Sequence, residues 1–141
     1  MSADNLLGED LLKLFNQLSG VFSESQYSRL LVAPQGIRSS LVAKIERERK
    51  NHLDGKPSQI RWKVNSLVDN GIIDALVAAA RDGVPIDLLV RGTCALRMSR
   101  VSKYRNVRIR SILGRFLEHS RIYSFHNAGN PEFYIGSADI M

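Results

Sequence analysis

Short apolar runs of strand length alternate with longer stretches of helical periodicity along most of the chain. The strand-like runs are residues 29–34, 59–65, 85–90 and 106–112. Between the first three, apolar residues recur every three or four positions, as on one face of a helix, over residues 39–55 and 69–83. Consecutive parallel strands need a crossover connection that is usually a helix. This order therefore predicts a mostly parallel sheet covered by helices.

The two ends of the chain depart from this alternation. RIYSF (121–125) and EFYIG (132–136) alternate apolar and polar residues around the turn-forming NAGNPE, which predicts an antiparallel hairpin. Residues 8–19 place leucines and a phenylalanine on one helical stripe, so we expect residues 1–22 to form a leading helix and linker. The predicted fold is α/β, a three-layer αβα sandwich with a mixed, mostly parallel sheet, in one domain over residues 1–141.

Composition excludes several classes of site. The one cysteine, Cys94, permits no intrachain disulfide and no cysteine-based zinc site, and we expect no metal ligand set in this chain. No apolar run approaches the roughly 20 residues of a membrane-spanning helix, and the N-terminus lacks the pattern of a signal peptide. We expect a cytoplasmic protein. Because the net charge is +6, a peripheral position at the inner membrane face is the alternative.

Much of the positive charge is concentrated in one run. Between Arg97 and Arg115 the chain has seven basic residues and no Asp or Glu. We predict that six of them form a polyanion-binding loop: Arg97, Arg100, Lys103, Arg105, Arg108 and Arg110. A polyphosphate chain or an acidic protein would fit this loop, and a solvated basic surface is the simpler alternative. The run contains one aromatic residue, Tyr104, so we expect no specific nucleic-acid partner.

Polar residues follow the strands at the edge where an α/β sheet usually binds its ligand. Lys63 and Asn65 stand at the end of the 59–65 run, and Arg91 directly follows the apolar 85–90 run. A guanidinium held close to the backbone can bind two phosphate oxygens at once. Arg91 is therefore a candidate phosphate ligand, with an ion pair to Asp87 or to an acidic residue of a helix as the equally open alternative.

His119 is the candidate for proton transfer. Arg121 follows it by two positions, which places both side chains on one side of a strand, and the hairpin would return Ser137 and Asp139 to the same place. A neighbouring carboxylate such as Glu118, or a later Asp, could fix the tautomer of the ring. This spacing is similar to one half of a phospholipase-D-type site, in which lysine and asparagine usually occupy the positions of Arg121 and Asp139. A purely structural histidine is the alternative.

Several longer strings closely resemble the C-terminal catalytic region of bacterial polyphosphate kinases. The strings are LLVAPQGIR, KVNSLVDNGIIDAL, GVPIDLLVRGTCALR, VRIRSILGRFLEHSRIYSF and YIGSADIM. The resemblance implies the second of two phospholipase-D-like domains, incomplete at its C-terminus. It also implies an enzyme that reversibly transfers the terminal phosphate of ATP to polyphosphate through a phosphohistidine, with Mg²⁺ in the complete enzyme.

The resemblance implies roles for individual residues. Arg91 matches an arginine that contacts the nucleotide phosphates, and His119 matches a supporting acid or base that also binds nucleotide. Arg121, Ser137 and Asp139 would line the same pocket. The family's nucleophilic histidine lies upstream of the matched region, so this chain is expected to supply a half-site and to be inactive alone. The implied partners are ATP or ADP, polyphosphate and the remainder of a polyphosphate kinase chain, with a homo-oligomer left open.

Two other functions stay open from the sequence. One is a non-catalytic module that binds polyanions through residues 97–110. The other is a phospholipase-D-like phosphodiesterase that acts as a homodimer with two copies of His119, although lysine would then be expected in place of Arg121.

Overall fold

A computed structural model describes residues 4–20, 26–33, 35–112 and 114–138 of the chain. The elements are α1 (Asn5–Leu18), α2 (Gln35–Leu53), β1 (Ile60–Val64), α3 (Asn70–Arg81), β2 (Ile86–Val90), α4 (Met98–Val101), β3 (Val107–Arg110), β4 (Arg121–Phe125), the 3-10 turn η1 (Asn127–Gly129) and β5 (Glu132–Gly136). They form two compact units that divide after Ile37. No helix in the described ranges is both long enough and apolar enough to cross a membrane.

The first unit contains α1 and a segment that is ordered by one carboxylate. Asp4 caps α1 by accepting from the backbone N–H groups of its first turn. Asp10, fully buried, accepts hydrogen bonds from the backbone N–H groups of Ser28, Arg29 and Leu30. The strand predicted over residues 29–34 is therefore wrong for its described part, residues 29–33. The backbone N–H groups of Arg29 and Leu30, the first two residues of the run, donate to the Asp10 side chain and not to a neighbouring strand.

The second unit is a five-stranded sheet in the order β3-β2-β1-β4-β5. β1 pairs in parallel with β2, and β2 with β3, while β4 pairs antiparallel with both β1 and β5. The predicted α/β fold with a mixed sheet is confirmed, and so is the hairpin of residues 121–125 and 132–136. α2 begins at Gln35, several residues before the predicted start at residue 39.

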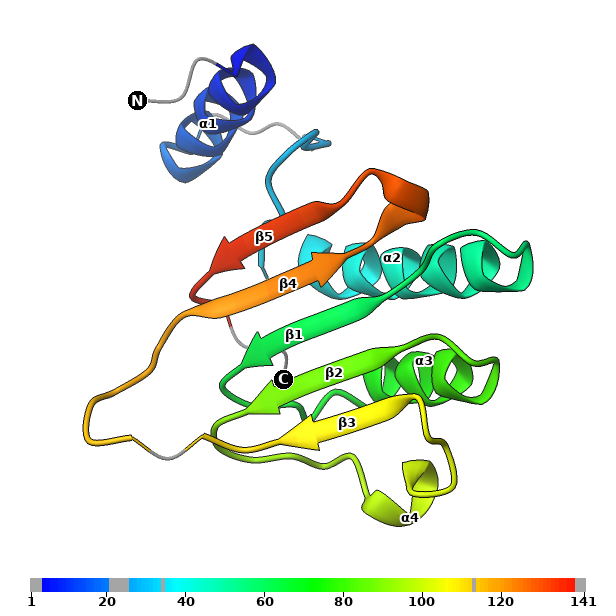
Figure 1. Cartoon of the computed structure of the whole chain (residues 1–141). Coiled ribbons are helices and arrows are strands. Elements are labelled where there is room, and N and C mark those ends of the chain that lie inside the picture. Colours follow the sequence, from blue (N-terminus) through cyan, green and yellow to red (C-terminus); the bar gives the residue numbers. More distant parts are fainter. Residues whose placement is uncertain (1–3, 21–25, 34, 113, 139–141) are drawn as a thin grey trace. The chain divides into compact units, whose positions relative to one another are not determined.

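One face of the sheet is covered by helices. α2 and α3 lie against the same face (Figure 1). The strand side chains that point to this face are buried: Ile60, Trp62 and Val64 on β1, Ile86, Leu88 and Val90 on β2, and Arg121, Tyr123 and Phe125 on β4. Trp62 packs edge-to-face on Tyr123 and Phe125, with ring centroids 5.2 and 5.9 Å apart. These contacts form the centre of the core.

Two polar side chains fix the ends of the strands. The buried carboxylate of Glu48 on α2 accepts from the backbone N–H groups of Gln59 and Asn127, at 3.0 and 2.8 Å. The side-chain amide of Asn106 donates to the carbonyl groups of Ala80 and Val84, at 2.9 and 2.7 Å. The start of β1, the turn after β4 and the start of β3 are thus tied to the helices.

The other face of the sheet has alternating charged and apolar side chains. Arg61 is exposed on β1, and Phe133 and Ile135 of β5 are 67% and 79% exposed. Within residues 38–112 and 114–138 the two long helices both lie on the opposite face (Figure 1). The second helical layer of the predicted three-layer sandwich is not among the described residues of this unit.

Candidate functional site

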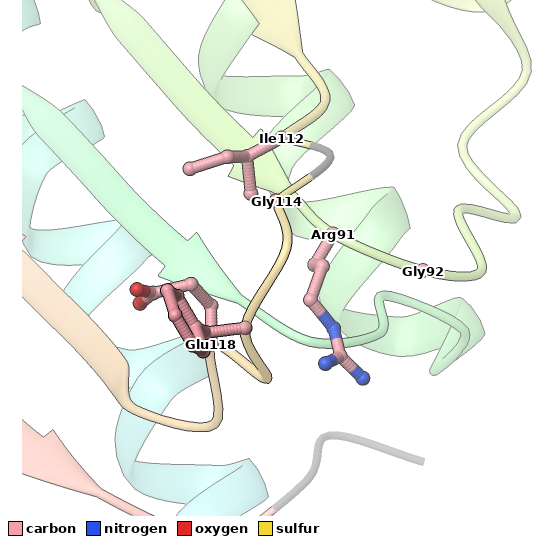
Figure 2. Close-up of a pocket in the computed structure, with 6 residues that line it drawn as sticks. Arg91, Gly92, Ile112, Gly114 and Glu118 are labelled. Carbon is pink, nitrogen blue, oxygen red and sulfur yellow. The ribbon is translucent and has the colours of Figure 1, made fainter.

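A pocket of about 260 Å³ opens where the parallel strands end. Its lining comes from two segments, the turn after β2 and the loop between β3 and β4 (Figure 2). The lining residues are Arg91, Gly92, Ile112, Gly114, Phe116 and Glu118. A pocket at the carboxyl ends of parallel strands is the usual place for a ligand in an α/β sheet.

Backbone hydrogen bonds fix Arg91 at the edge of this pocket. Its N–H group donates to the carbonyl oxygen of Val64 at 3.1 Å, and the N–H group of Gly92 donates to that of Asn65 at 2.8 Å. A Cβ atom on Gly92 would lie 3.2 Å from the same Asn65 oxygen, so glycine allows the turn to approach the end of β1. Asp87 pairs with Arg110 at 2.9 Å, so the alternative in which it pairs with Arg91 is not what the structure shows.

Lys63 anchors the loop that carries Glu118 and His119. Its Nζ atom donates to the Oε2 atom of Glu118 at 2.9 Å and to the carbonyl and hydroxyl oxygens of Ser120 at 3.1 and 2.9 Å. This hydrogen bond lowers the pKa of Glu118, and the positive charge of Arg91 lowers it further. Glu118 is therefore an ionised carboxylate between two cations. Lys63, predicted as a phosphate ligand, holds the loop in this structure.

Arg121 and His119 are in direct contact. Arg121 opens β4 and is 1% exposed, whereas His119 is exposed. The Nη1 atom of Arg121 lies 3.0 Å from the Nδ1 atom of His119 and also donates to the carbonyl oxygen of His119. The ring nitrogen thus faces a guanidinium, and the predicted tautomer partner, Glu118, is engaged by Lys63 instead. We find Arg121 beside His119, as expected, but buried.

The remaining predicted site residues are only partly brought together. The main-chain carbonyl oxygen of Asn65 accepts a hydrogen bond from the N–H group of Gly92. Gly136 pairs with Arg121 in the β4–β5 register, which places the exposed Ser137 one residue beyond that pair. Asp139 lies outside the described residues. Sequence reasoning missed Ile112, Gly114 and Phe116 as lining residues, and no motif or periodic pattern marked them as part of a pocket.

The predicted polyanion loop contains regular structure. Residues 98–101 form α4 and residues 107–110 form β3. Arg100 pairs with Asp74 at 2.8 Å, and Arg110 pairs with Asp87. The Lys103 ammonium group lies 5.2 Å from the centre of the Tyr104 ring. The other three cations of the set are exposed: Arg97, Arg105 and Arg108.

The described residues do not fit a Mg²⁺ site. Nowhere among them do three His, Cys, Asp or Glu side chains gather closely enough to hold a metal ion. Glu118, the carboxylate of the pocket, is paired with Lys63.

Comparison with known proteins gives one consistent family. The sequence model described as polyphosphate kinase C-terminal domain 2 matches residues 30–141. A polyphosphate kinase of Streptomyces coelicolor is 49% identical over 141 residues, which are 100% of this chain and 19% of that protein. One from Synechocystis is 53% identical over 135 residues, covering 96% of this chain and 18% of that protein.

A solved structure has the same fold. The crystal structure of polyphosphate kinase from Porphyromonas gingivalis superposes with a TM-score of 0.86 at 39% identity, covering 100% of this chain and 23% of that one. The chain thus spans about a fifth of the length of these relatives. With a family match over most of its residues, the chain belongs to the polyphosphate kinase C-terminal domain 2 family.

Proposed function

We propose that this chain supplies the nucleotide- and phosphate-binding half-site of a polyphosphate kinase, which reversibly transfers the terminal phosphate of ATP to polyphosphate through a phosphohistidine. The observation that carries the proposal is the pocket at the strand ends, where Arg91 lies on one wall and the loop up to Glu118 forms the other. His119 is the next residue of that loop and is not itself among the lining residues. Membership of the family supports the reaction class.

The chemistry of phosphoryl transfer fits such a pocket. Negative charge spreads over the oxygens of the transferred group, so fixed positive charge and hydrogen-bond donors lower the barrier. Arg91 supplies the guanidinium for the phosphates of ATP or ADP, and His119 assists without acting as the nucleophile. Ser137 is a further phosphate ligand in this proposal. No step of it passes through a metal ion held by this chain.

The nucleophilic histidine lies, in this proposal, on the remainder of the kinase chain. The isolated 141 residues should therefore bind ATP weakly and form no phosphohistidine. Incubation with ATP labelled at the terminal phosphate tests this directly. Robust labelling of the isolated chain, or synthesis of polyphosphate by it, would refute the half-site role.

Three exposed cations favour a second candidate, a non-catalytic module that binds polyanions. Arg97, Arg105 and Arg108 show no ion pair to an acidic side chain in the described parts of the chain. If these three cations supply most of the binding free energy, binding of polyphosphate should weaken steeply as the salt concentration rises and should persist in the His119→Ala variant. Loss of binding in His119→Ala, with no loss on reversing the charge of Arg105, would exclude this candidate.

A further inference from the structure

We propose that Arg121 is a positioning residue, which fixes His119 in the tautomer with its proton on Nε2. The inference rests on the proposed function, because it narrows what His119 does there. It assigns to Arg121 a part other than the phosphate ligand expected from the sequence.

The hydrogen-bond chemistry leaves one arrangement. A guanidinium has N–H donors and no acceptor at neutral pH. With the Nη1 atom of Arg121 at 3.0 Å from the Nδ1 atom of His119, that ring nitrogen must accept and so has no proton. A neutral imidazole has one N–H group, which must then be Nε2–H.

The donor is held firmly in place. Arg121 starts β4 opposite Gly136 and is 1% exposed on the helix-covered face. The same Nη1 atom donates to the carbonyl oxygen of His119, so the guanidinium contacts both the ring and the main chain of the histidine. A guanidinium keeps its charge in a protein even when it is buried, and burial removes most of the rotamer freedom of the side chain.

His119, which supplies the acceptor, lies between two residues that are bonded to Lys63. Lys63 bonds to Glu118 before His119 and to Ser120 after it. Lys63 alternates onto the open face of the sheet and Arg121 onto the covered face. Lys63 and Arg121 therefore bond to three consecutive loop residues, which places the main chain of His119 so that its Nδ1 atom meets the guanidinium of Arg121.

The tautomer decides the chemistry of His119. An Nε2–H group donates a hydrogen bond to a phosphate oxygen, and it has no lone pair with which to attack phosphorus or accept a proton. Arg121 thus makes the exposed nitrogen of His119 a donor in phosphate binding. The general-base and nucleophilic roles would require the other tautomer.

Nuclear magnetic resonance of the chain with ¹⁵N- and ¹³C-labelled histidine tests the proposal without substrate. His126 provides an internal reference, since its Nδ1 atom accepts from the backbone N–H group of Gly129 at 3.1 Å. At a pH where the rings are neutral, His119 should show the same pattern as His126, with a proton on Nε2 alone. A mixture of tautomers, or a proton on Nδ1, overturns the proposal. His119→Gln assigns the signals.

Two variants separate positioning from folding. Arg121→Met keeps the length of the side chain without a donor, and Arg121→Lys keeps a donor. We expect His119 to become a mixture of tautomers in the first and to stay mainly Nε2–H in the second. An unchanged tautomer in a folded Arg121→Met variant overturns the proposal. If that variant does not fold, the spectrum of the unaltered chain decides alone.

Failure of this inference and failure of the proposed function give different results. If the chain binds ATP but His119 does not have its proton on Nε2, the positioning role of Arg121 is refuted and the half-site proposal is retained. If His119 has its proton on Nε2 but the chain does not bind ATP, the positioning role of Arg121 is supported and the half-site proposal is refuted.

Discussion

The ammonium group of Lys63 lies 2.9 Å from the Oε2 atom of Glu118, and this ion pair joins β1 to the loop that leads into β4. The same ammonium group bonds twice to Ser120. A strand of the sheet thereby determines where the loop with His119 lies. Binding at the pocket should therefore depend on a residue that does not line it.

Lys63→Met should loosen this loop without unfolding the sheet. The substitution removes three hydrogen bonds and keeps the aliphatic part of the side chain, so amide hydrogens of residues 114–122 should exchange faster. Hydrogen exchange read by mass spectrometry measures this. Lys56→Met, which removes the exposed pair with Asp54, is the matched control and should leave the loop unchanged. Equal exchange in both variants would show that Lys63 does not hold the loop.

Glu132 should make the chain sensitive to acid. The hydrogen bond from Arg47, against the opposing effect of burial and with further help from Lys44, lowers the pKa of Glu132 to about 2. The pKa is below its unfolded value, so the stabilisation is present above about pH 4.5 and is lost as the pH falls toward about 2. Glu132→Gln should cost on the order of 1 to 2 kcal/mol at pH 7, after allowance for solvent screening.

Urea denaturation at several pH values measures this effect. The Glu132→Gln variant and the unaltered chain should converge in stability as the pH approaches 2. Glu46→Gln, an exposed partner of Arg49, serves as the control and should change stability little. A gap that persists at low pH would mean that packing, and not charge, accounts for the loss.

Asp10 should control the order of the segment that follows α1. Burial raises the pKa of Asp10, but the backbone N–H groups of Ser28, Arg29 and Leu30 together lower it below its usual value. Asp10→Ala leaves these three amides without their acceptor, so their hydrogens should exchange much faster. Nuclear magnetic resonance can follow each amide. Asp4→Ala removes the cap of α1 and the ion pair with the Arg29 side chain but leaves the Asp10 acceptor in place, so the amides of residues 28–30 should stay protected.

The sheet core should be intolerant of truncation at one tryptophan. Trp62 is 2% exposed and contacts the rings of Tyr123 and Phe125, so Trp62→Ala should cost roughly 3 to 5 kcal/mol of unfolding free energy. Phe133→Ala removes a ring that is 67% exposed on the open face and should cost under about 0.5 kcal/mol. Thermal or urea unfolding distinguishes the two. Similar losses of unfolding free energy in the two variants would show that Trp62 is not at the centre of the core.

Regular periodicity predicted the sheet, and specific side-chain bonds account for where prediction failed. The alternation in RIYSF and EFYIG gave the bounds of β4 and β5, because one face of each strand meets the core. The run at 29–34 is just as apolar, yet its first two amides donate to Asp10, 19 and 20 positions away. A hydrogen bond over that separation leaves no periodic signal.

In the candidate site, too, local sequence patterns predicted positions along the chain but not contacts between residues that are far apart in the sequence. The position of Arg91 after an apolar strand was enough to place it at the edge of a pocket. The proximity of His119 and Arg121 followed from their spacing, but the burial of Arg121 did not, because burial depends on which face of β4 the helices cover. The pairing of Lys63 with Glu118 joins residues 55 positions apart and was equally hidden from the sequence.

Titration of the isolated chain with ATP, followed by calorimetry or by amide shifts, tests the half-site most directly. The unaltered chain should bind weakly, and Arg91→Ala should weaken binding at least tenfold, or about 1.4 kcal/mol. Arg81→Ala removes the same charge from the exposed end of α3 and should bind as the unaltered chain does. An equal loss in both variants, or an unchanged affinity in Arg91→Ala, would contradict the assignment of the pocket to nucleotide phosphates.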